Sequence, residues 1–147
     1  MTSSQPETLY QRIRRHEGCN LIPYKDTEGF WTIGWGHRLK SDEYFKYREG
    51  ITQAQADNIF EEDLAHAVRL ASAGLRCYQS LCKPRQDVLS EMVFQLGYLA
   101  VCKFKNVLLA LDLREYNKAA DEMLNSLWHK QTPARCEELA AIMRKGA

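Results

Sequence analysis

The 147-residue sequence has no long apolar run and no excess of charge, and each absence excludes a class of protein. A membrane-spanning helix needs roughly 20 consecutive apolar residues, and no segment approaches that length. The 20 basic and 19 acidic residues leave a net charge of +1, so nucleic acid is not an expected partner. Residues 1–7 lack the charged start and apolar stretch of a signal peptide, so we expect a cytoplasmic protein.

Paired cysteine motifs are also missing. The five cysteines are scattered, odd in number and without a CxxC spacing: Cys19, Cys77, Cys82, Cys102 and Cys136. This pattern favours reduced thiols over a disulfide framework or a zinc site, and we expect neither a metal nor another cofactor. The length suits one folding unit, and 45% hydrophobic with 27% charged residues is typical of a globular domain, predicted here as a single domain over 1–147.

The residues that suggest chemistry gather between positions 16 and 37. Glu17 ends a helical pattern and is followed by Gly18, Asp26 begins a turn, and Thr32 lies in a β-branched and aromatic run that predicts a strand. Cleavage of a glycosidic bond needs an acid on one side and a carboxylate or activated water on the other. Two acids at this spacing are also common on solvated surfaces.

Three short motifs make this stretch specific: Glu17-Gly18, then Tyr24-Lys25-Asp26-Thr27-Glu28-Gly29, then Thr32-Ile33-Gly34-Trp35-Gly36-His37. With them the sequence resembles the phage-type lysozyme (muramidase) family, the endolysins similar to the lysozyme of T-even bacteriophages. Further similar segments occupy residues 92–97 and 128–135, so the resemblance runs from about Leu9 to Arg135.

The resemblance implies an α+β, mainly α, lysozyme-like fold with two lobes flanking a cleft. A small β-hairpin lobe is expected at about 18–51, and a helical lobe at about 52–147 together with an N-terminal helix at about 6–17. The residues themselves place a capping box at Thr52 and Gln55, at the start of a long helix that Gly74 ends. Pro84 and Pro133 are expected in the first turns of later helices.

The resemblance also implies an activity. It is hydrolysis of the β-1,4 link between N-acetylmuramic acid and N-acetylglucosamine in bacterial peptidoglycan, with inversion at the anomeric carbon. Glu17 would protonate the departing oxygen, while Asp26 and Thr32 would hold and activate a water. The expected setting is a monomeric endolysin that lyses the host for phage release once a separate holin opens the membrane.

Four further residues are expected to support the site. Asp63 interrupts an apolar helical stripe, where an unpaired buried carboxylate would be costly. The resemblance implies that His37 pairs with it; the alternative is an Asp63 partly exposed at the edge of the stripe. The resemblance further implies that Gln95 faces the cleft and that Arg135 lies beside Glu17.

Other functions remain open from the residues alone. A lytic transglycosylase also uses one glutamate but needs no water-binding partner, so Asp26 and Thr32 argue against it. A catalytically inactive muramidase fold, kept as a cell-wall or partner-binding module, is disfavoured because none of the three residues is lost. A nucleic-acid binder built on the basic run 12–15 is the weakest alternative.

Overall fold

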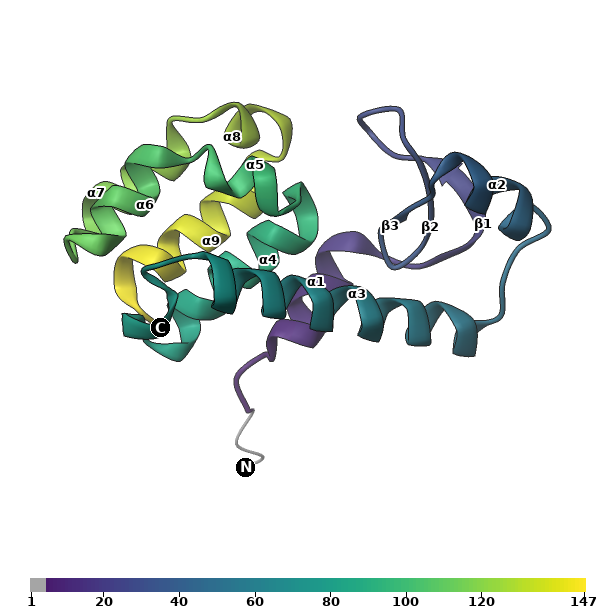
Figure 1. Ribbon diagram of the computed structural model, residues 1–147, viewed down its shortest axis with the longest axis horizontal. Helices are drawn as coiled ribbons and strands as arrows, with labels where there is room; N and C mark the ends of the chain where they lie inside the picture. Colours follow the sequence, from purple (N-terminus) through teal and green to yellow (C-terminus); the bar gives the residue numbers. More distant parts are fainter. Residues whose placement is uncertain (1–4) are drawn as a thin grey trace. The chain divides into compact units, whose positions relative to one another are not determined.

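The computed structural model describes residues 5–147 and is mainly α-helical with one small sheet (Figure 1). Residues 1–4, on which part of the signal-peptide expectation rests, lie outside the described residues. The chain divides into two compact units, Met1–Ala65 and His66–Ala147. The predicted fold class, α+β and mainly α, is confirmed.

The first unit contains a three-stranded antiparallel sheet in the order β1-β2-β3. Its elements are α1 (Leu9–Glu17), β1 (Asn20–Lys25), β2 (Trp31–Gly34), β3 (His37–Arg38), α2 (Ser41–Tyr47) and the first part of α3 (Gln53–Gly74). Pro23 lies in β1, an edge strand, as expected of a residue that cannot donate to a ladder. The short helix α2 was not predicted.

Helix α1 begins three residues later than the sequence suggested, at Leu9 rather than near residue 6. The reason is a capping box. The Thr8 hydroxyl accepts a hydrogen bond from the Gln11 amide at 3.1 Å, and the Gln11 side chain accepts one from the Thr8 amide at 3.0 Å. These bonds satisfy amides at the helix start that would otherwise lack partners. Gly18, with a φ of +66°, ends the helix as expected.

Helix α3 begins and ends as predicted. The Thr52 amide donates to the Gln55 side chain at 2.8 Å, and the Gln55 amide donates to the Thr52 hydroxyl at 3.1 Å, which completes the capping box. The sequence placed a lobe boundary near residue 52, whereas the compact units divide within α3. The helix contributes Ala56 to the core of the first unit and Ala67 to that of the second, which explains a division part-way along it. The expectation of a single domain stays a prediction.

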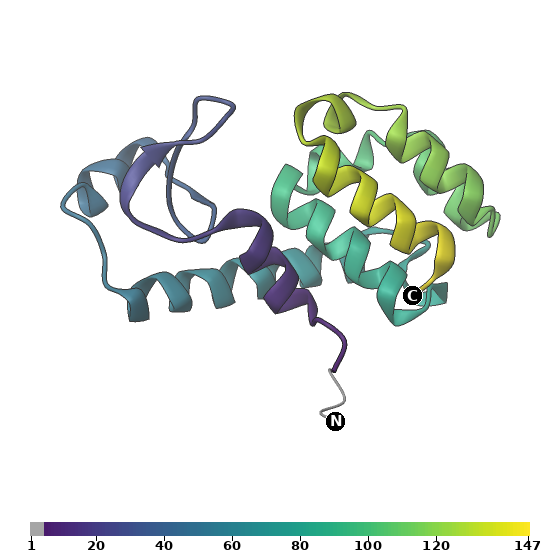
Figure 2. The ribbon, with the colours of Figure 1, turned by 180° about the vertical axis from the view of Figure 1, so that it is seen from behind.

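The second unit is helical and carries the larger core. After the second part of α3 come a short 3₁₀ turn, η1 (Tyr78–Ser80), and α4 (Lys83–Leu96), α5 (Tyr98–Cys102), α6 (Lys105–Asp112), α7 (Tyr116–Leu124), α8 (Leu127–Gln131) and α9 (Pro133–Lys145). Helices α7 and α9 lie side by side (Figures 1 and 2). Pro84 and Pro133 occupy first turns, as predicted. The fully buried core side chains include Leu89, Met92, Leu111, Met123, Leu139 and Met143.

The five cysteines all lie in the described part of the chain and are free thiols. Burial raises the pKa of Cys77 to about 11 and that of Cys136 to about 12, so both stay protonated and act as small apolar core groups. Across the described residues, no helix combines the length and the apolar character that crossing a membrane demands.

Candidate active site

Glu17 is the last residue of α1, and its carboxylate lies against the backbone of Gly36, in the turn between β2 and β3. A Cβ atom added to Gly36 would stand 2.7 Å from Cδ of Glu17 and closer still to its Oε2. Gly36 also has a φ of +78°, a conformation that favours glycine. The second glycine of the motif therefore provides the space that the Glu17 carboxylate occupies.

The turn that carries Gly36 is fixed by its neighbour Trp35. The Trp35 indole N–H donates to Asp57 Oδ1 of α3 at 2.9 Å, and the Arg14 guanidinium of α1 lies over the indole at 4.0 Å from the ring centroid. Arg14 also approaches Asp57 at 3.7 Å. The pKa of Asp57 is lowered, first by the Trp35 hydrogen bond and then by one from Gln53. This cluster ties the turn to α1 and α3 and holds Gly36 against Glu17; sequence reasoning missed it.

Asp26 closes the turn between β1 and β2. Its Oδ1 accepts hydrogen bonds from the amides of Glu28 and Phe30, both at 2.9 Å. Its Oδ2 accepts a hydrogen bond from Arg38 Nε of β3 at 3.2 Å. The Asp26 carboxylate is thus held by the turn through Oδ1 and by β3 through Oδ2.

Thr32 lies in β2 and is only 2% exposed. Its hydroxyl donates to the Phe30 carbonyl at 2.9 Å. Because a hydroxyl has one proton and two lone pairs, this bond uses the proton and leaves the Thr32 oxygen as an acceptor for any further partner. Thr32 can therefore accept a hydrogen bond from a water molecule but cannot donate one to it.

One phenol connects these groups. Tyr24 of β1 stands directly opposite Thr32 in the antiparallel register. The pKa of Tyr24 is raised, first by burial of the phenol and then by the negative charges of Glu17 and Asp26. Since such interactions weaken with distance, both carboxylates lie near the same phenol. Glu17 thus lies against the β2–β3 turn, Asp26 lies in the β1–β2 turn, and Thr32 lies on the strand between these turns.

His37, at the start of β3, forms the predicted contact with Asp63 of α3. Its Nδ1 lies 2.7 Å from Asp63 Oδ2, and its Nε2 lies 3.3 Å from Glu43 Oε2, a partner that the sequence did not reveal. The Asp63 hydrogen bond is the main cause that raises the pKa of His37, against an opposing effect of burial. Burial also works to raise the pKa of Glu43, but the Lys40 amide and His37 outweigh it, so this pKa is lowered. The contacts join the sheet to α2 and α3.

We predict that the His37 contacts stabilise the fold most in mildly acidic solution. Because folding raises the pKa of His37, its contribution is complete below the ordinary value of 6.5 and is lost as the pH rises through the raised value. The lowered pKa of Glu43 acts in the opposite sense: its contribution is complete above 4.5 and is lost as the pH falls through the lowered value. Both are complete between pH 4.5 and 6.5. Urea unfolding of the wild type and His37→Asn over this range and on both sides of it measures the difference.

A double-mutant cycle tests whether the stabilisation by His37 comes from its contact with Asp63. His37→Asn with Asp63→Asn is expected to show a coupling energy of about 1 kcal/mol, since the groups touch and are partly buried. His37→Asn with Glu43→Gln is the matched control and is expected to show less, because that contact is longer, at 3.3 Å against 2.7 Å. Strict additivity for His37 and Asp63 would contradict the pair.

The other two predicted residues belong to the second unit and have partners there. The Gln95 carbonyl accepts from the Trp128 indole N–H at 3.0 Å, and its amide donates to the Thr132 hydroxyl at 3.2 Å. Arg135 Nε donates to Glu91 Oε2 at 2.9 Å, and Glu91 is fully buried. Sequence reasoning missed Glu91, although an acid within an apolar helical stripe was a usable signal. That Gln95 faces a cleft and that Arg135 lies beside Glu17 stay predictions.

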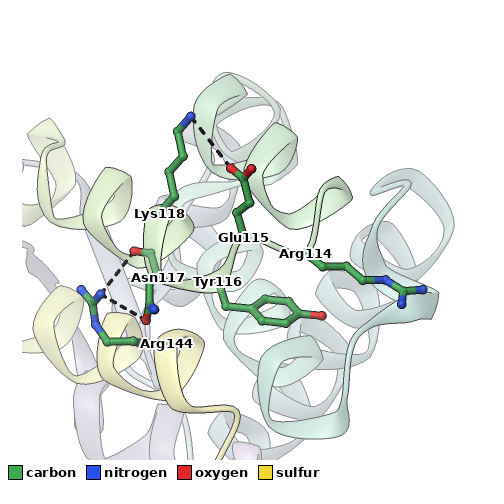
Figure 3. Close-up of a pocket in the computed structure, with 6 residues that line it drawn as sticks. All are labelled: Arg114, Glu115, Tyr116, Asn117, Lys118 and Arg144. Atoms are coloured by element: carbon green, nitrogen blue, oxygen red, sulfur yellow. Dashed lines mark hydrogen bonds and ion pairs between the residues drawn. The ribbon is translucent and has the colours of Figure 1, made fainter.

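A surface hollow of about 410 Å³ in the second unit carries no predicted site residue (Figure 3). It is lined by Arg114, Glu115, Tyr116, Asn117, Lys118 and Arg144. Arg144 donates to Asn117 and pairs with Asp121 at 2.7 Å, and Lys118 lies 3.9 Å from Glu115. Its cations are thus largely neutralised by neighbouring groups. Within residues 5–147, no group of three or more His, Cys, Asp or Glu side chains could hold a metal ion.

Comparison with known proteins points to one family. Residues 14–145 match the family described as Phage lysozyme. The chain is 31% identical to Probable T4-type lysozyme 2 of Dictyostelium discoideum, with 95% of each chain covered. It is 33% identical to the Endolysin of Salmonella phage P22, with 81% of this chain and 79% of that protein covered. It is also 31% identical to the Pre-baseplate central spike protein Gp5 of Enterobacteria phage T4, covering 95% of this chain but 28% of that protein.

Proposed function

The chain belongs to the phage lysozyme family, and from that premise we propose that it hydrolyses the β-1,4 bond between N-acetylmuramic acid and N-acetylglucosamine in bacterial peptidoglycan. The observation that carries the proposal is the placement of two carboxylates on one sheet: Glu17 lies against Gly36 of the β2–β3 turn, and Asp26 is held in the β1–β2 turn. Glycoside hydrolysis uses such a pair of carboxyl groups, one on each side of the scissile bond.

Glu17 is the general acid in this proposal. It gives its proton to the glycosidic oxygen as the bond from that oxygen to the anomeric carbon breaks. Its position at a helix end, closed in by the Gly36 backbone, restricts the directions in which the proton can be transferred. Restricted geometry of this kind is a major source of rate acceleration.

Asp26 and Thr32 hold the water that attacks the anomeric carbon from the opposite side. The Thr32 oxygen, whose own proton goes to the Phe30 carbonyl, accepts one hydrogen of the water. Asp26 accepts the other hydrogen and takes that proton as the new carbon–oxygen bond forms. Asp26 then releases its proton to solvent and solvent returns a proton to Glu17, which restores both groups. Because the water attacks opposite the leaving group, the product has the inverted configuration.

A lytic transglycosylase or an inactive cell-wall-binding module would carry different marks. A transglycosylase closes an anhydro ring within the substrate and uses no attacking water, so Asp26 and Thr32 would have no role in its reaction. A binding module does not need the Asp26 carboxylate to be held by three donors. The hydrogen bonds that hold Asp26 and Thr32 in place favour hydrolysis by water.

Analysis of digested peptidoglycan tests the proposal. Purified cell walls are incubated with the protein, and the new glycan ends are identified by mass spectrometry. Hydrolysis of the proposed bond yields reducing N-acetylmuramic acid ends. Anhydro-muramic ends would mean transglycosylation, new N-acetylglucosamine reducing ends would mean a different bond, and intact glycan would mean a binding module.

We also propose that the biological setting is host lysis, because endolysins stand among the relatives. In that setting the protein stays in the host cytoplasm and reaches the wall when a separate holin opens the membrane. Expression in a host with and without a membrane-permeabilising protein distinguishes the cases. Lysis that depends on permeabilisation supports the setting, and lysis without it opposes the need for a holin.

A further inference from the structure

Tyr24 lies on the sheet where the reacting groups meet, yet none of the proposed steps uses it. It pairs with Thr32 across β1 and β2. Directly opposed residues in an antiparallel pair extend from the same face, with Cβ atoms about 4.5–5.5 Å apart. The half-buried phenol therefore extends over the same face as the Thr32 hydroxyl.

The Tyr24 hydroxyl forms no hydrogen bond with any residue in the described part of the chain, 5–147. A buried or half-buried tyrosine hydroxyl usually has a partner. Here burial raises the pKa of the phenol most, followed by the negative charges of the Glu17 and Asp26 carboxylates. The phenol thus keeps its proton at neutral pH, which suits it as a hydrogen-bond donor and not as a base.

The attacking water can accept one hydrogen bond from such a donor. Its two hydrogens go to Thr32 and Asp26, and one of its two lone pairs must point at the anomeric carbon. The second lone pair needs a donor to fix the rotation of the water. Thr32 cannot supply it, because its proton goes to the Phe30 carbonyl.

We propose that Tyr24 is a further catalytic residue, whose hydroxyl donates to the attacking water and orients the reactive lone pair toward the anomeric carbon. The proposal rests on the proposed hydrolysis, since it assigns a third contact to the same water. A donor held on the face shared with Thr32, in the region of both carboxylates, meets that requirement.

Tyr24→Phe removes only the hydroxyl, and Tyr44→Phe is the matched control. Tyr44 lies in α2 of the same unit and packs on Trp31 at a ring-centroid distance of 4.8 Å. For Tyr24→Phe, kcat on soluble peptidoglycan glycan fragments is expected to fall by about tenfold to a hundredfold, with little change in KM, because the contact acts in the transition state. The Tm is expected to change little, because the hydroxyl has no partner to lose. Tyr44→Phe is expected to retain wild-type kcat and KM.

Three results would overturn the proposal: a wild-type kcat for Tyr24→Phe, a rise in KM alone, or a large drop in Tm, which would reveal a structural partner for the hydroxyl. Glu17→Gln, measured in parallel, separates this failure from that of the proposed function. An inactive Glu17→Gln beside a fully active Tyr24→Phe refutes only the role of Tyr24. An active Glu17→Gln refutes Glu17 as the general acid, and a wild type that leaves the glycan fragments intact refutes the proposed function itself.

Discussion

Replacement of Glu17 by Gln is expected to reduce the clearing of permeabilised bacteria to background. The glutamine side chain has nearly the same volume and fits the space beside Gly36, but it has no proton to transfer. Loss of general acid catalysis alone costs about a hundredfold to ten-thousandfold in rate. The fall in turbidity of a bacterial suspension, followed at equal protein concentrations, measures the effect.

The control for this experiment is Glu49→Gln. The Glu49 side chain is 91% exposed, and its Oε1 lies 3.6 Å from Arg48 Nε, a loose contact. The same chemical change there is expected to leave clearing and Tm unaltered. Wild-type clearing by Glu17→Gln, with the protein folded, would remove Glu17 from the role of general acid.

Replacement of Thr32 by Val is expected to lower kcat by about a hundredfold or more while the protein remains folded. Valine keeps the shape and the β-branching that suit a buried position in β2, but it removes the acceptor oxygen for the water. It also leaves the Phe30 carbonyl without its side-chain donor. That loss costs about 1 kcal/mol, equivalent to a Tm decrease of a few degrees. Steady-state kinetics and thermal unfolding measure the two effects separately.

Thr32→Ser serves as the control because it retains the hydroxyl and loses only a methyl group. It is expected to keep much more activity than Thr32→Val, although the lost methyl lowers its stability somewhat. The role would be structural if Thr32→Val unfolded while its folded fraction kept full specific activity. An equal loss of activity in the serine and valine variants would likewise argue against water positioning.

The candidate site could be proposed from the sequence because the family motifs that identify its three central residues are close together in the chain. Glu17, Asp26 and Thr32 lie on one helix end, one turn and one strand that follow each other directly, so the order of elements already brings them together. The contact of His37 with Asp63 joins distant segments: the apolar helical stripe indicated that Asp63 requires a partner, and the family resemblance identified that partner as His37.

The contacts that the sequence did not reveal depend on packing between segments far apart in the chain. Trp35 could be read as a strand-end aromatic, but nothing local shows that its indole N–H reaches Asp57. The pair of Arg135 and Glu91 likewise depends on how α9 packs on α4. Such choices of partner follow from the rotation of each helix about its axis, which periodicity alone does not fix.

The fold was predicted best where local capping decides it. The start of α3 follows from the short-range hydrogen bonds of the Thr52 capping box. The end of α1 follows from the backbone conformation of Gly18. The start of α1 was placed too early, because Pro6 suits a first turn but the Thr8 capping box lies further along. The helix α2 was missed because it is short and has no buried residue to give a periodic pattern.

The configuration of the first product tests hydrolysis by a held water most directly. A soluble glycan fragment of peptidoglycan is cleaved in an NMR tube, and the anomeric proton signals of the new reducing N-acetylmuramic acid are recorded before mutarotation. Attack of water from the side opposite Glu17 predicts that the α-anomer appears first from the β-linked substrate. The β-anomer appearing first would contradict it, because retention requires a covalent glycosyl intermediate in place of the water held by Asp26 and Thr32.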